Sequence, residues 1–141
     1  MLVPDVNVLL NVQLTTQAHH DRAVDWLRHG SEGDEEIGIA NLVLSAVVRI
    51  LTSTGVSPTP LAPADAFTFC DYVLKLRTTV AIQEGPRHWD IFRTLVLESG
   101  VSGPHVSDAY LAAFAIENNA TFVTFDRGFR RFEGLKLQVL E

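Results

Sequence analysis

Three aspartates are the residues of this chain whose type and setting best suit catalysis. Asp5 follows a short apolar segment, Asp126 follows the apolar run ATFVTF, and Asp108 opens the helical stretch before that run. Clustered carboxylates repel one another and gather stably only around a cation or a shared proton. Oxygen ligands favour Mg²⁺ or Mn²⁺, and such an ion stabilises phosphodiester charge and generates hydroxide from bound water. Phosphodiester hydrolysis is the chemistry that such a cluster predicts.

Each of these acids also has an ordinary structural interpretation. Asp5 can cap a helix, Asp108 can be a first-turn acid favoured by the helix dipole, and Asp126 can form a turn beside Gly128. His105, close to Asp108 in sequence, is either a general base or an exposed loop residue. Spacing alone leaves the metal cluster and the purely structural roles both open.

The elements that must position these acids alternate between strand and helix. The expected strands cover residues 2–6, 36–40, 79–83, 121–125 and 136–140, and the expected helices cover 7–15, 18–28, 41–54, 63–76, 87–99 and 107–118. Gly30 should end the second helix and Ser107 should cap the last. This alternation predicts one domain, residues 1–141, with an α/β fold: a three-layer α/β/α sandwich around a mostly parallel central sheet. Ligands bind at the carboxyl ends of parallel strands, where Asp5 and Asp126 stand.

The composition limits the kind of protein that this chain can be. Its 141 residues, 47% hydrophobic and 20% charged, suit one soluble globular domain. A single cysteine, Cys70, excludes an internal disulfide, and zinc-type Cys/His spacing is absent. With no basic leader and no uncharged run of transmembrane length, we expect a cytoplasmic protein that is not in a membrane. The net charge of −6 means that bound metal and a small basic patch must attract any nucleic acid.

Several strings of the sequence resemble the PIN domain, and in particular the VapC-type toxins of bacterial toxin–antitoxin systems. They are LVPDVNVLLN, LSAVVRILT, RHWDIFRTLVLESG, VSDAYLAAFAIENNATFVTFDRGFRRF and LKLQVL, which together cover essentially the whole chain in order. The resemblance implies the PIN fold and an endoribonuclease activity that depends on Mg²⁺, with Mn²⁺ able to substitute. It further implies transfer, ribosomal or messenger RNA as substrate, a VapB-type antitoxin as partner, and a homodimer.

The resemblance also assigns roles to individual positions. Asp5, Asp108 and Asp126 match the acids that bind metal and perform catalysis in the family. Asn7 and Thr124 match polar positions that hydrogen-bond ligands or waters beside those acids.

A basic and aromatic segment directly follows Asp126. We expect Phe129 and Phe132 to lie in the core, while Arg127 and Arg130 are candidates for contact with RNA phosphate. The alternative is that these arginines are simply solvated.

The sequence departs from the family at one position. Many members carry a glutamate three residues before an arginine, and here Ala46 stands at that spacing before Arg49. Three acids can still hold one Mg²⁺, which keeps several waters, whereas a second ion is in question. An acid-depleted domain that binds RNA or protein without cutting is therefore the alternative function, although the retained Asp5, Asp108 and Asp126 weigh against it. Arg49 itself can pair with an acid of the site or with an antitoxin carboxylate.

Overall fold

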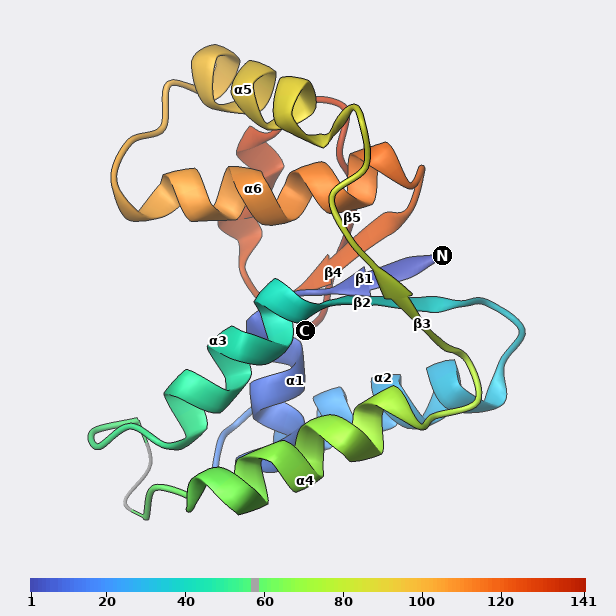
Figure 1. Ribbon diagram of the computed structural model, residues 1–141, viewed down its shortest axis with the longest axis vertical. Coiled ribbons are helices and arrows are strands. Elements are labelled where there is room, and N and C mark those ends of the chain that lie inside the picture. Colours follow the sequence, from blue (N-terminus) through green and yellow to red (C-terminus); the bar gives the residue numbers. More distant parts are fainter. Residues whose placement is uncertain (57–58) are drawn as a thin grey trace.

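A five-stranded, entirely parallel sheet forms the centre of the computed structural model, which describes residues 1–56 and 59–141 (Figure 1). The strand order is β3-β2-β1-β4-β5. The strands are β1 (Leu2–Pro4), β2 (Ile37–Ala40), β3 (Thr79–Ile82), β4 (Thr121–Thr124) and β5 (Lys136–Val139). Each strand after β1 follows a crossover that contains at least one helical segment, which is the connection that parallel neighbours require.

Helices cover both faces of this sheet. They are α1 (Val6–Gln13), α2 (His20–Glu32), α3 (Asn41–Leu51), α4 (Pro63–Leu74), α5 (His88–Ser99) and α6 (Pro104–Glu117), with a 3₁₀ helix, η1 (Arg127–Arg131), before β5. Figure 1 shows α1 to α4 on one side of the sheet and α5 and α6 on the other. The predicted three-layer α/β/α fold is therefore confirmed.

Two apolar cores hold these layers together. The first packs α1 to α4 against the sheet through side chains such as Leu9, Ile37 and Val47. The second packs α5, α6 and η1 against the opposite face around Phe122 and Phe129. Strand β2 is buried at every residue, as expected for an interior strand of a parallel sheet that is covered on both faces.

The second helix extends beyond its predicted end. Gly30 was expected to end it, but α2 continues to Glu32, and Gly33 is its C-cap residue. The reason lies in packing, because a Cβ atom at Gly30 would stand 2.9 Å from Cδ1 of Ile37. This glycine allows the helix to pass close to β2 rather than ending it.

The last helix begins earlier than predicted. Gly103, with a φ of 60°, makes the turn into α6, and Pro104 occupies the first helical turn instead of Ser107 capping it. Asp108 consequently lies in the second turn, not the first. Residues 57–58 belong to the loop expected between α3 and α4 and lie outside the described part of the chain.

The carboxylate of Glu117 joins the end of α6 to the loop that leads into α5. It accepts hydrogen bonds from the backbone N–H groups of Gly85 (2.7 Å) and Arg87 (2.8 Å), and the Arg87 guanidinium donates to the Glu117 carbonyl (2.9 Å). The contact fixes α5 and α6 relative to each other on the face of the sheet that they cover.

We expect Glu117→Ala to lower the free energy of unfolding by roughly 1–3 kcal/mol, because two backbone donors lose a charged acceptor. Urea denaturation followed by circular dichroism measures this. Glu32→Ala is the matched control, since Glu32 is an exposed glutamate at the end of α2. Equal losses in the two variants would contradict the structural role of Glu117.

Candidate active site

The pairing of β1 with β4 brings the two ends of the chain's sequence together. Pro4 lies opposite Val123 in the parallel register, and the backbone N–H of Asp5 donates to the Val123 carbonyl at 2.8 Å. Directly after β1, Asp5 also caps α1, since its Oδ1 accepts from the N–H of Val6 at 2.7 Å. The backbone of Asp5 is thereby fixed to β4, and its carboxylate is held at the carboxyl edge of the sheet by the N–H of Val6.

Polar side chains from two strand ends orient the Asp5 carboxylate. The Thr124 hydroxyl donates to Oδ2 of Asp5 at 2.6 Å, and Nδ2 of Asn7 lies 3.0 Å from the same oxygen. The Asn7 side chain also accepts from the N–H of Phe125, and the N–H of Asp126 donates to Thr124. The structure thus shows Asn7 and Thr124 as positioning residues for Asp5, while their contact with substrate stays a prediction.

The electrostatic state of Asp5 shows that the three aspartates share one environment. The pKa of its carboxyl is raised to about 6, mainly by burial, since 6% of the residue is exposed, and to a smaller extent by the charges of Asp108 and Asp126. The hydrogen bonds from Thr124 and from the N–H of Val6 oppose this rise. Residues 5, 108 and 126, distant in sequence, therefore lie within electrostatic reach of one another.

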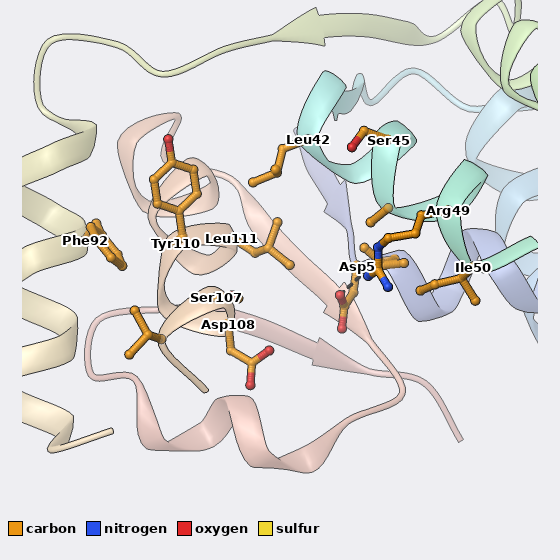
Figure 2. A pocket seen from close by; sticks show the side chains of 13 residues that line it. Asp5, Leu42, Ser45, Arg49, Ile50, Phe92, Ser107, Asp108, Tyr110 and Leu111 are labelled. Atoms are coloured by element: carbon orange, nitrogen blue, oxygen red, sulfur yellow. Dashed lines mark hydrogen bonds between the residues drawn. The ribbon is translucent and has the colours of Figure 1, made fainter. Parts of the chain in front are cut away.

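Asp5 and Asp108 line the same cavity, which has a volume of about 630 Å³. Figure 2 shows Asp5 at the junction of β1 with α1 and Asp108 on α6, with α3 forming another wall. The Asp108 side chain is 28% exposed and contacts Nδ1 of His105 at 3.1 Å. The cavity is lined by Asp5, Val6, Leu42, Ser45, Ala46, Arg49, Ile50, Phe92, Val106, Ser107, Asp108, Tyr110 and Leu111.

Asp126 occupies a different position from the other two acids. It is exposed and caps η1, because its Oδ1 accepts from the N–H of Gly128 at 2.7 Å. It is not among the cavity-lining residues. Its interpretation as a turn former is therefore confirmed, its charge also acts on Asp5, and its role in metal binding stays a prediction.

In the segment after Asp126, the structure confirms the prediction for the aromatic residues but does not test the one for the arginines. Phe129 and Phe132 are buried, which confirms their predicted place in the core. Arg127 is paired with Glu141 at 3.0 Å on the surface. Arg130 is exposed, and its contact with RNA stays a prediction.

The donor chemistry of this site suits a hard divalent cation. The acids offer carboxylate oxygens only, and Asp5 is desolvated beside two like charges, which a cation would offset. Among the described residues, no three His, Cys, Asp or Glu side chains are already gathered in metal-binding geometry. Mg²⁺ is commonly held by one or two carboxylates and several waters, so this donor set fits it.

Sequence reasoning missed much of the cavity wall. Leu111 follows Asp108 by three residues, so helical spacing around Asp108 would have found it. Ser45 and Phe92 have no such signal, because α3 and α5 meet this cavity only through tertiary packing.

This arrangement defines a class of protein: a three-layer α/β domain whose parallel sheet carries interacting aspartates and a cavity at its carboxyl edge. The PIN domain family model matches residues 2–135, and the chain belongs to that family. It is similar to Ribonuclease VapC43 of Mycobacterium tuberculosis (strain ATCC 25618 / H37Rv), with 36% identity over 96% of this chain and 92% of the relative. Ribonuclease VapC37 of the same strain is also 36% identical, over 96% of this chain and 94% of the relative.

Solved structures agree on the fold. The crystal structure of VapBC2 from Rickettsia felis, bound to a DNA fragment from its promoter, matches with a TM-score of 0.74 and 19% identity, covering 99% of this chain and 98% of that chain. DNA-bound VapBC from Salmonella typhimurium matches with a TM-score of 0.66 and 15% identity, covering 98% and 96%. In the described residues of the present chain, no helix is long and apolar enough to cross a membrane.

The raised pKa of Asp5 predicts how stability changes with pH. The native carboxyl has a pKa of about 6 against an ordinary value of 3.8, so the native state holds more protons than the unfolded chain between these values. The contribution of Asp5 to the free energy of unfolding is therefore largest at acidic pH, and it falls as the pH rises from about 4 to about 6. In chelator, we expect wild type to lose roughly 2 kcal/mol from about pH 4 to pH 7 relative to Asp5→Asn.

Urea denaturation at a series of pH values measures this difference. Asp21→Asn is the control, because Asp21 is exposed on α2 and should leave the wild-type profile unchanged. Parallel profiles for wild type and Asp5→Asn would show that Asp5 is not held in a desolvated state.

Proposed function

We propose that this protein is a Mg²⁺-dependent endoribonuclease and the toxin of a VapBC-type toxin–antitoxin pair. The observation that carries the proposal is the desolvated Asp5 carboxylate at the edge of a cavity that Asp108 also lines. Such a group is costly to the fold, and a cluster of this kind is typical of a functional site. The relatives that match nearly the whole chain are named ribonucleases, which supports the choice of reaction.

Asp5, Asp108 and Asp126 are the residues that would hold the metal. When bound, the ion supplies charge stabilisation at the phosphodiester and a water of lowered pKa. Asp5 is the best oriented of the three, because Thr124 and Asn7 fix its Oδ2 and the N–H of Val6 fixes its Oδ1. A preorganised carboxylate of this kind needs no rearrangement during the reaction.

Asp108 supplies the second wall of the site. It projects from α6 into the cavity across from α3, and His105 contacts its Oδ2 (Figure 2). Asp126 adds negative charge at the sheet edge from its cap position at η1. In the proposed site, these residues would supply oxygen ligands from three separate segments near the ends of β1 and β4.

The proposed partners follow from the relatives. The structures of similar fold from Rickettsia felis and Salmonella typhimurium are VapBC complexes, which supports a VapB-type antitoxin for this chain. We extend the proposal to an RNA substrate, whether transfer, ribosomal or messenger RNA, and to a homodimer in solution.

Substitution of the acids tests the reaction directly. We expect purified, antitoxin-free wild type to cut total RNA in Mg²⁺ or Mn²⁺, and Asp5→Asn or Asp108→Asn to lose roughly 10²-fold or more in rate. Asp21→Asn on the surface of α2 should cut like wild type. A wild type that is folded but inert with metal would instead favour the acid-depleted, non-cleaving domain, for which Ala46 in the cavity wall is the supporting observation.

Metal should also stabilise the fold in the absence of RNA. Above pH 7, Mg²⁺ at about one hundred times its Kd should add about 3 kcal/mol to wild-type stability, since it binds only the native site. Thermal unfolding with Mg²⁺ and with chelator measures this shift, and Asp5→Asn should show little of it. An equal shift in both proteins would place metal binding elsewhere.

A further inference from the structure

Arg49 is a cationic side chain in the wall of the acidic cavity. It extends from α3 toward the part of the cavity where Asp5 lies, while Asp108 lines the same space from α6 (Figure 2). We propose that the Arg49 guanidinium binds a phosphate of the RNA backbone inside this cavity, beside the aspartates. The inference rests on the proposed nuclease function and names the residue that holds the substrate there.

The geometry of α3 directs this residue inward. Ser45, Ala46 and Arg49 share one face of the helix and line the cavity. The opposite face, including Val43 and Val47, is buried in the core. Because α3 begins directly after β2, it starts at the carboxyl edge of the sheet, which is also the edge of the aspartates.

The charge of Arg49 is not committed to another protein group. Among the described residues, no ion pair or side-chain hydrogen bond involves its guanidinium, and it is the single basic side chain among the residues that line the cavity. Arg127, in contrast, is paired with Glu141, and Arg28 with Asp25. Arg49 lies in the last turn of α3, where the helix dipole favours a cation. The dipole would favour a cation on any face of this turn, so it does not explain why Arg49 lies on the cavity face.

A phosphate fits these surroundings better than another ligand does. Two aspartates and a net charge of −6 repel RNA, so the cavity needs a fixed positive charge to admit a phosphodiester. The planar guanidinium matches two phosphate oxygens with parallel hydrogen bonds. Many family members carry a glutamate at the position of Ala46. Because alanine has no charge, Arg49 has no acid beside it on this wall of the cavity to neutralise it.

The salt dependence of RNA binding tests this contact separately from cleavage. The probe is a labelled single-stranded oligoribonucleotide of mixed sequence, bound in Mg²⁺ by the Asp108→Asn protein so that it stays intact. Adding Arg49→Ala should weaken binding roughly tenfold or more. It should also reduce the slope of log K against log salt by about 0.7, the value for one phosphate contact on a single strand.

Two further variants sharpen the result. Arg49→Lys should keep the salt slope, because the charge remains, while cleavage in the otherwise wild-type protein falls because the planar fork is lost. Arg28→Ala removes the same charge from the surface of α2 and should change neither affinity nor slope. Unfolding curves should show that each variant is folded, because both arginine side chains are exposed.

The outcomes separate this inference from the proposed function. If wild type cuts RNA but Arg49→Ala cuts and binds like Arg28→Ala, the nuclease stands and the role of Arg49 is overturned. If Arg49→Ala keeps RNA affinity and instead loses binding to a partner protein, the inference is also overturned, in favour of a carboxylate ligand. If wild type does not cut at all, an altered salt slope in Arg49→Ala still supports the phosphate contact.

Discussion

The parallel register between β1 and β4 is the constraint on which the site depends. It places Asp5, at the end of the first strand, against Thr124, at the end of the fourth, across 119 positions of sequence. A one-residue shift would turn the side chains of β1 to the opposite face of the sheet and break this contact. The register is secured on both faces by apolar cores, so the fold and the orientation of the carboxylate are stabilised by the same packing.

That orientation comes at a cost to the fold. A buried carboxylate near two like charges is less stable ionised than it would be in water, and the raised pKa of Asp5 expresses this. Hydrogen bonds from Thr124 and the N–H of Val6 offset only part of the cost. A divalent cation bound there would offset the rest, which is the physical basis of the proposed metal site.

The cavity has an uneven distribution of charge. Asp5 and Asp108 make one region acidic, whereas the facing wall from α3 carries Arg49 and lacks an acid at Ala46. In a site with a full set of acids, metal ions alone would have to neutralise the substrate. In the proposal made for Arg49, a fixed guanidinium takes part of that work, which would let a domain with fewer acids cut RNA.

Local sequence was sufficient for the order of elements and for the acids. Apolar periodicity gave the strands and helices because burial imposes it residue by residue, and strand ends located Asp5 and Asp126 at the ligand-binding edge. The predicted end of α2 was wrong because Gly30 allows a close approach to Ile37, a contact that is distant in sequence.

Tertiary structure alone decided the rest. It placed Asn7 and Thr124 within hydrogen-bond distance of Asp5. It also placed Asp126 as the cap of η1 and Arg49 in the wall of the cavity. No local pattern could specify these roles, because each depends on which segments the sheet order and helix packing bring together. The sequence by itself determined which side chains could do chemistry, and the fold determined which of them face one another.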